Sequence, residues 1–403
     1  MLGYSKVRLG LLFRLGRRKR PDKSDGVEDL RGDCCTLPQE LVDEWLFCLS
    51  DPIDFRACAL VCRSWSGTAL RLLYKAVAVT GVTRRYIRLW NTLRTSPHLV
   101  SHIHSLVLHR GPKLKIEAFE KVCNFPFTHL ENVSITHDRR TFMTLPSAFA
   151  LQRLFSLPTL RRMALECNFR QWAAFLPIWI ACSSTIRHLE LRCVNYNPTF
   201  LPPAQKHSSP LIVLESLRLG YLNFVDGWLQ HHLCPFDFSR LSVLAIDVHS
   251  SVVSWPQIAP ALQTIEALEF ASHMEDQRPI DLSLFPNLQF LHISVYISCT
   301  TLALAALSTI TSSSRVREII FSIRPPRANA CAQLDSEVAG LPLQHAFTVG
   351  LEMGAEVYAR WAPHFSRLNS RNLLCRTDYD WFEKQRDRKK LTITTPAALP
   401  SPF

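Results

Sequence analysis

The residues of this sequence that could do chemistry do not have the spacings that catalysis or metal binding needs. The thirteen cysteines are odd in number and scattered, without the paired spacings of a disulfide framework or a zinc site. Cys58 and Cys62 lie four apart in an apolar helical pattern, and His231-His232-x-Cys234 comes nearest to a ligand cluster. We expect free, buried thiols in a reducing compartment, with no metal and no cofactor.

Known catalytic motifs are also missing. The sequence contains no GxGxxG, Walker, GxSxG or HExxH motif. His188-Leu-Glu190 places an imidazole two residues from a carboxylate, but ordinary alternation along a strand produces that spacing. We therefore assign no catalytic residues and expect a protein that is not an enzyme, with a site spread over a repeat surface as the open alternative.

The positive charge is concentrated near the two ends of the sequence. Of the net charge of +12, residues 1–20 contribute +7 and residues 384–390 contribute +4. The remaining body is close to neutral, so we do not expect nucleic acid as a partner. Binding of the basic ends to anionic membrane or nucleic acid stays a weaker alternative. The N-terminal stretch, apart from being a solvated tail, could be a transit peptide, a nuclear signal or a membrane-surface helix.

A repeat positions most of the remaining residues. The pattern apolar-x-x-apolar-x-apolar occurs nine times, starting at Ile103, Leu130, Leu160, Ile186, Leu214, Leu241, Ile265, Leu288 and Val316. The mean spacing of about 27 residues lies within the range of leucine-rich repeats. One repeat cannot bury its apolar face alone, but stacked parallel strands can. Each buried Leu or Ile contributes about 1.5–3 kcal/mol, so the repeats predict a solenoid.

Helices are expected to cover the outer side of these strands. Residues 116–122, 172–180 and 301–310 have suitable apolar patterns, with a kink at Pro177. A last helix is expected over 350–368. The residues that flank the last two apolar positions of each triple should face the concave side, where a substrate could bind. They are His109, Arg162, Glu166, His188, Glu190, Arg192, Arg218, Asp247, Glu269, His292 and Glu318.

Residues 36–74 predict three short helices. Thr36 and Gln39 have the spacing of a capping box, while Asp51 and Pro52 can cap and start a second helix. Leu37, Leu41, Trp45 and Leu49 form one apolar stripe. A unit of this size buries little within itself, so it needs an outside surface.

This segment resembles the F-box, the module that connects substrates to ubiquitin ligases through a Skp-family adaptor. The matching residues are Leu37-Pro38-x-Glu40-Leu41, Leu46, Leu49, Asp54-Phe55 and Leu60-Val61-Cys62-Arg63-x-Trp65. Trp45 departs from the family, which usually has Ile or Leu there. The repeats that follow look like the degenerate leucine-rich repeats of F-box families in mushroom-forming fungi.

The resemblance implies which side chains contact the Skp-family protein and, through it, a cullin ubiquitin ligase. They are Leu37, Pro38, Leu41, Trp45, Leu46, Leu49 and Trp65. The implied function is a substrate-recognition adaptor in the cytoplasm or nucleus, with an unknown protein substrate. A repeat scaffold outside any ligase, capped by the helices, is the alternative.

The expected fold is an α/β repeat: a small all-α module followed by a leucine-rich-repeat-like solenoid. We place a basic, disordered tail and linker at 1–33, the F-box-like module at 34–75 and the solenoid at 76–325. A C-terminal cap region follows at 326–390, and a disordered tail at 391–403. No stretch predicts a transmembrane segment.

Overall fold

The computed structural model describes residues 38–49, 51–112, 114–137, 142–169, 176, 178–196, 211–220, 234–247, 258–272, 279–296, 300–324 and 328–377. The chain divides into two compact units, Met1–Arg140 and Thr141–Phe403. The expected tails, Leu37, and the His231-His232 pair lie outside the described residues, as does most of the helix expected at 172–180.

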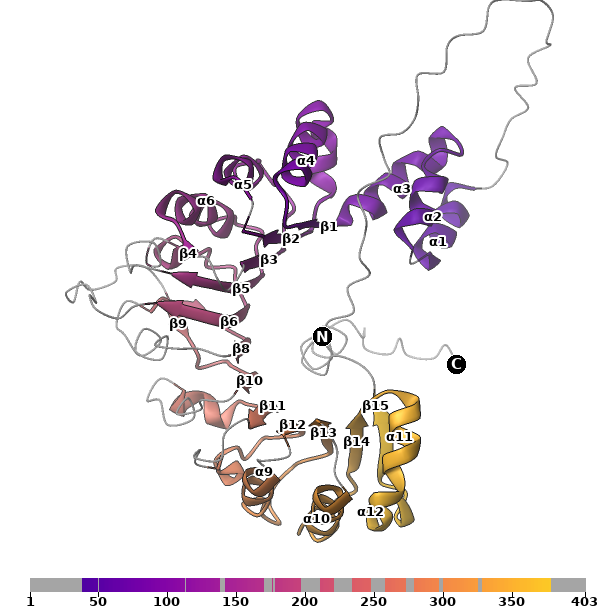
Figure 1. Ribbon diagram of the computed structural model, residues 1–403, viewed down its shortest axis with the longest axis vertical. Coiled ribbons are helices and arrows are strands. Elements are labelled where there is room, and N and C mark those ends of the chain that lie inside the picture. The colour runs from indigo at the N-terminus through magenta and orange to yellow at the C-terminus, as the bar shows by residue number, and fades with distance from the viewer. Residues whose placement is uncertain are drawn as a thin grey trace, which may run out of the picture. The chain divides into compact units, whose positions relative to one another are not determined.

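The first unit begins with α1 (Gln39–Cys48), α2 (Pro52–Cys58) and α3 (Arg63–Lys75), which we call the helical module (residues 38–75; Figure 1). The Asp51 side chain accepts a hydrogen bond from Ile53 N, and Pro52 is the first helical residue, which confirms the predicted start of α2. The predicted Thr36 cap of α1 is wrong, because α1 begins at Gln39 and Pro38 holds the capping position.

The same unit continues with alternating strands and helices. They are β1 (Ala76–Thr80), α4 (Thr83–Thr95), the 3-10 helix η2 (Pro97–His102), β2 (Ser105–Arg110), α5 (Ile116–Cys123) and β3 (Asn132–His137). β2 pairs in parallel with β1 on one side and β3 on the other. The helix expected at 116–122 is therefore confirmed as α5.

The second unit has the same construction over more repeats. Its strands are β4 (Phe142–Met143), β5 (Arg162–Phe169), β6 (His188–Tyr196), β7 (Ile212–Val213), β8 (Ser216–Gly220), β9 (Phe236–Asp237), β10 (Val243–Asp247), β11 (Ala267–Ser272), β12 (Phe290–Tyr296), β13 (Glu318–Arg324), β14 (Thr348–Glu352) and β15 (Leu374–Thr377). Its helical segments are α6 (Leu145–Phe155), η4 (Ala259–Gln263), η5 (Leu282–Leu284), α9 (Thr300–Leu307), α10 (Ala328–Ala339), α11 (Ala355–Trp361), η7 (Ala362–His364) and α12 (Ser366–Ser370).

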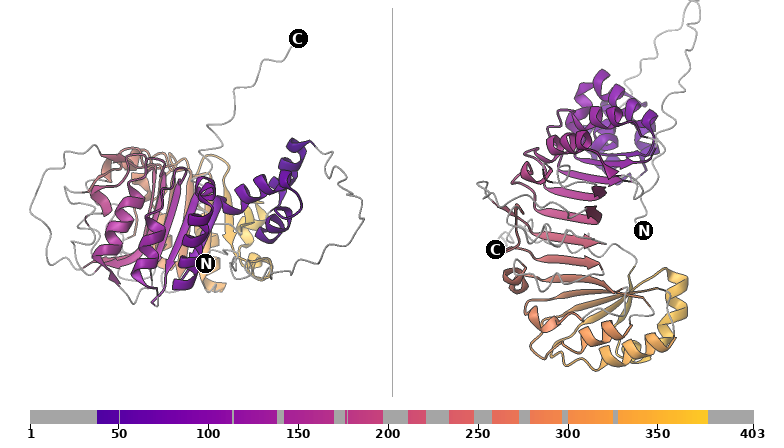
Figure 2. Two further views of the ribbon diagram at one scale, coloured as in Figure 1. Left: turned by 90° about the horizontal axis from the view of Figure 1, so that it is seen from above. Right: turned by 60° about the vertical axis from the view of Figure 1, so that its left-hand side comes forward.

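The long strands of this unit lie side by side in the order β5-β6-β8-β10-β11-β12-β13-β14-β15 (Figure 2). All these neighbours pair in parallel, β4 adds to β5, and β7 pairs separately with β9. Helices α6, α9 and α10 cover one face of the sheet (Figure 1). We call the opposite face the inner face.

The repeat predicted from the sequence is confirmed in register. Leu106 pairs with Val133 in the first unit, and Leu244 with Leu268 in the second, so equivalent positions of successive triples lie side by side. Each of the 27 apolar positions in the nine triples is at most 5% exposed. The triples therefore form the core of an α/β, solenoid-like fold, as expected.

The repeats continue beyond the predicted boundary at residue 325. β14 pairs with β13 and β15 pairs with β14, both in parallel. The single helix expected over 350–368 is wrong. Residues 348–352 form β14, and η7, which contains Pro363, separates α11 from α12. Proline has no backbone N–H to continue a helix.

Buried hydrogen bonds hold this C-terminal end together. The Asp335 carboxylate on α10 is 3% exposed and accepts hydrogen bonds from Arg367 N and Leu368 N, each at 2.9 Å. A buried carboxylate needs such partners, and here it satisfies the backbone groups at the start of α12.

Candidate functional sites

The helical module has a very small core. Val42, Leu46, Cys58 and Ala69 are buried together, and Leu49, Ala59, Trp65 and Leu72 pack around them. Burial raises the pKa of the Cys58 thiol. So few buried residues provide limited stabilisation, and the remaining apolar side chains of the module point elsewhere.

Six large apolar side chains of the module are exposed. They are Leu41 (52%), Trp45 (49%), Phe47 (59%), Ile53 (66%), Leu60 (75%) and Val61 (61%). Single exposed apolar residues are common on proteins, but six within 38 residues are a concentration that favours an interaction surface. We call these six residues the apolar surface of the module.

The residues predicted to contact an adaptor are divided by the structure. Pro38 and Leu41 are exposed, and Leu49 and Trp65 are partly buried. Leu46 is fully buried at 0% exposure, because it lies on the side of α1 that faces α3, and we exclude it from the apolar surface.

Trp45 does not stand alone on this surface. Its ring centroid lies 5.2 Å from that of Trp65, with an interplanar angle of 50°. Such tilted aromatic pairs are favourable beyond the area that they bury. The Trp45 indole is therefore held by a second indole of the same module.

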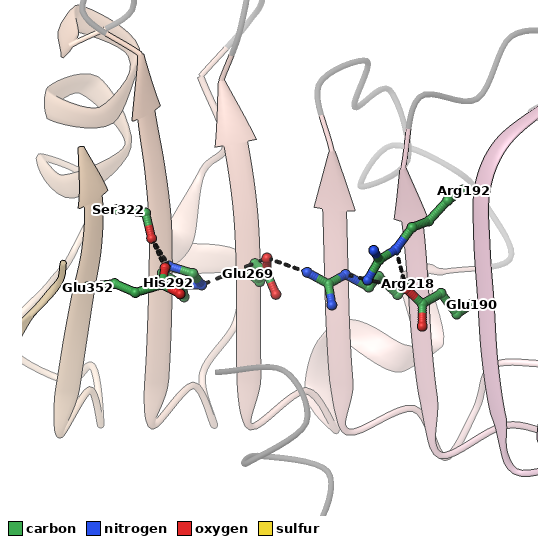
Figure 3. A network of polar contacts seen from close by, with 7 residues as sticks. All are labelled: Glu190, Arg192, Arg218, Glu269, His292, Ser322 and Glu352. Carbon is green, nitrogen blue, oxygen red and sulfur yellow. Dashed lines mark hydrogen bonds and ion pairs between the residues drawn. The ribbon is translucent and has the colours of Figure 1, made fainter. Parts of the chain in front are cut away.

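The inner face of the second unit carries a row of interacting polar side chains (Figure 3). Glu190, Arg218, Glu269 and His292 occupy equivalent positions on β6, β8, β11 and β12, one between the last two apolar residues of each triple. Arg192, Ser322 and Glu352 lie two residues further along their strands than this row. We call these seven residues the inner-face network.

Ion pairs join the first half of this network. Glu190 pairs with Arg192 on the same strand, and its Oε1 lies 4.0 Å from Arg218 Nε. Arg218 Nη2 donates to Glu269 Oε1 at 2.9 Å. Exposure of the Arg218 and Glu269 side chains is only 18% and 13%, so the pair is weakly screened by solvent.

A small residue allows this contact across a strand. Arg218 on β8 and Glu269 on β11 are separated by β10, where Ala245 occupies the equivalent position. Neighbouring strands lie about 4.8 Å apart, so the guanidinium must reach across roughly twice that distance. Ala245 is 2% exposed, in keeping with an ion pair that covers its methyl group.

Hydrogen bonds join the second half. His292 Nε2 lies 2.8 Å from Ser322 Oγ and 3.3 Å from Glu352 Oε2, while its Nδ1 lies 3.8 Å from Glu269 Oε1. Ser322 Oγ donates to Glu352 Oε2. A serine, an imidazole and carboxylates thus meet in one place, which are the residue types of a hydrolytic triad.

The direction of these hydrogen bonds opposes that chemistry. A carboxylate only accepts, so the Ser322 hydroxyl gives its single proton to Glu352. The Ser322 hydroxyl therefore donates to Glu352 and not to His292 Nε2, the nitrogen that would act as the base in a triad. Ser322 and His292 are also only 3% and 4% exposed. The geometry favours a structural network over a nucleophile.

Several predicted inner-face residues lie in the expected positions outside this network. Arg162 pairs in register with His188, and His188 Nδ1 is 2.9 Å from Ser216 Oγ. Glu166 and Glu318 are partly buried on β5 and β13. His109 lies on β2 of the first unit, and Asp247 ends β10 with its side chain outside the described part.

Ser322 and Glu352 of this network are not among the residues predicted from the sequence. Ser322 directly follows the last apolar residue of its triple, the offset that identified Arg192, so the same rule could have found it. Glu352 lies within the range 350–368, where a helix was expected, and the structure places it at the end of β14. The inner face is also less polar than expected, since Val243, Ala245, Ala267 and Ile320 are buried there with Phe290 packed against them.

Within the described residues, no three His, Cys, Asp or Glu side chains gather as a metal site. None of the helices in that part of the chain is long and apolar enough to cross a membrane. Compared with protein-family models and with curated proteins, the sequence matches none of them.

Proposed function

We propose that this chain is an adaptor that brings a protein substrate to a ubiquitin ligase. In this proposal the helical module is an F-box that docks on a Skp-family protein and through it on a cullin, while the inner face binds the substrate. The adaptor performs no chemistry of its own. It raises the effective concentration of the substrate at the ligase.

The apolar surface of the module is the observation that carries this proposal. The segment that resembles an F-box exposes Leu41, Phe47 and Leu60 at 52%, 59% and 75%. A protein partner that covered such side chains would gain the hydrophobic free energy that the module leaves unused, about 25 cal/mol per Å². Interfaces of this kind depend on a few central apolar anchors.

A pull-down with a purified Skp-family protein tests the proposal. The variant Leu41→Ala/Phe47→Ala removes two exposed side chains from α1, so the module should keep its fold. The affinity for the Skp-family protein should fall at least tenfold, which is about 1.4 kcal/mol of binding free energy, and less protein should be retained. Leu284→Ala/Val357→Ala is the matched control, because both side chains are 42% exposed and lie in the second unit. No retention of the unaltered chain, or equal losses in both variants, contradicts the proposal.

One observation favours a second candidate, a repeat scaffold in which the helices act only as an end cap. α3 leads directly into β1, and His104 N donates a hydrogen bond to Lys75 O at 3.0 Å. Solenoids need such caps. Under this alternative, deletion of residues 38–75 unfolds the repeats. Under the adaptor proposal the repeats stay folded and only the Skp-family interaction is lost, as circular dichroism and the pull-down would show.

A further inference from the structure

We propose that the exposed face of α4 is a docking surface for an acidic protein segment. α4 carries Arg84, Arg85, Arg88 and Arg94 and contains no acidic residue. This surface lies outside both the apolar surface of the module and the inner-face network. The inference does not depend on the adaptor function.

The packing of α4 determines which side chains it exposes. Tyr86, Leu89 and Leu93 lie on one side of the helix and are at most 3% exposed. Tyr86 Oη also donates a hydrogen bond to His109 O at 3.0 Å, which ties the helix to β2. The four arginines occupy the remaining arc of the helix, where Arg84, Arg85 and Arg94 are exposed and Arg88 is partly buried.

The charges on α4 are unfavourable for the helix itself. Arg84 and Arg85 stand in its first turn, where the helix dipole is positive and acidic residues are preferred. Arg84 and Arg88 are like charges four residues apart, so they repel each other. Among the described residues neither has a hydrogen bond or an ion pair, whereas Arg85 is bound to Thr80. A bound anion would relieve both effects.

Two further cations extend the surface toward α5. Arg94 Cζ and Lys121 Nζ lie 5.2 Å and 4.8 Å from the ring centroid of Trp90, so the indole holds both beside the arginines. Glu117 and Glu120 on α5 are the nearest acids in the sequence. Within the described part of the chain, neither forms an ion pair with α4.

An acidic peptide fits this surface better than nucleic acid does. The cationic strip follows a single helix of 13 residues, roughly 20 Å long. Arg84 and Arg88 match carboxylates that are three or four residues apart on a partner. Proteins that bind single strands offer aromatic rings for base stacking, but Trp90 already contacts Arg94 and Lys121.

Fluorescence anisotropy with the full chain tests this inference. The probe is a labelled 14-residue peptide with Glu at every third or fourth position, measured in low salt. Arg84→Gln/Arg88→Gln, which keeps good helix formers, should weaken binding on the order of tenfold. The control Arg240→Gln/Arg317→Gln removes the same charge from exposed positions of the second unit and should change binding less than twofold.

Three results would overturn it. The first is an equal loss in both double variants, which would indicate attraction by net charge alone. The second is equally tight binding of a peptide in which Gln replaces every Glu. The third is tighter binding of a single-stranded oligonucleotide, or of phosphatidylserine vesicles, that depends on Arg84 and Arg88, because it would assign the surface to another class of ligand.

Discussion

The helical module and the inner face of the second unit differ in how far each satisfies its own side chains. The module leaves six large apolar residues exposed around a core of four buried residues. The inner-face network pairs its charges internally, with Arg218 bound to Glu269 and Ser322 to Glu352. One region lacks a partner for its apolar area, and the other already has partners for its charges.

This difference determines what each region requires of a binding partner. A partner of the module would only need to cover exposed apolar side chains. Its affinity could therefore be high without displacing any polar contact of the module. A protein that bound the inner face would have to compete with the existing ion pairs, or contact the charges that remain accessible, such as Arg192 at 34% exposure. Selectivity is therefore expected on the inner face more than on the module.

The largest effect should separate buried from exposed leucines within α1. Leu46→Ala removes a side chain that is 0% exposed, so it should destabilise the module by about 2–5 kcal/mol. Leu41→Ala, at 52% exposure, should cost less than about 0.5 kcal/mol. Hydrogen exchange of α1–α3 amides measures both. If the two variants lose the same protection, the division of α1 into a buried side and an exposed side is wrong.

The contrast between the two regions was only partly predictable from the sequence. Local periodicity identified the strands, because a Leu-x-Leu pair on a parallel strand is buried whatever its neighbours are. Periodicity could not show that Leu46 is buried while Leu41 is exposed, since both residues match the F-box-like sequence pattern. That choice depends on where α3 packs, which is a tertiary contact.

The same limit applies to the polar residues. Arg218 and Glu269 were placed on the inner face by their offset in the repeat, but their contact depends on Ala245 on the strand between them. The arginines of α4 could not be recognised from the net charge for another reason. Acidic residues elsewhere in the body of the chain cancel the charge of these four arginines, so the body is close to neutral although α4 is strongly basic.

A double-mutant cycle should test the internal pairing of the inner face. Glu269→Leu or Arg218→Met alone leaves a charge poorly solvated and should lower the free energy of unfolding by roughly 1–3 kcal/mol. The double variant should cost less than the sum, by about 0.5–3 kcal/mol. Denaturant unfolding gives all four values. Strict additivity would mean that Arg218 and Glu269 do not stabilise each other. The charges of the inner face would then lack effective partners, as the exposed apolar side chains of the module do.

Thiol labelling should compare the stability of the two cores directly. Cys58 and Cys234 are 5% and 8% exposed, so each reacts only when its surroundings open. The module has the smaller core and should open more often, so alkylation of Cys58 should be on the order of tenfold faster. Mass spectrometry of digested protein distinguishes the two sites, with the exposed Cys48 as the unprotected reference. Equal rates would show that the chain opens as one unit.

The smallest expected effect is a loss of stability of the second unit in alkali. Burial raises the pKa of Cys234 from 9.0 to about 12. The folded state keeps the thiol protonated, whereas the unfolded state loses the proton above pH 9. The stability that the protonated thiol contributes to the folded state is therefore complete below pH 9 and is lost as the pH rises toward 12. At pH 10 this loss amounts to on the order of 1 kcal/mol.

Cys234→Ala should therefore reduce the difference in unfolding free energy between pH 8 and pH 10, although it costs some packing at both. Cys375→Ala, at an exposed position of the same unit, is the control and should leave that difference unchanged. If Cys234→Ala also leaves this difference unchanged, the Cys234 thiol is solvated in the folded state, and burial does not raise its pKa.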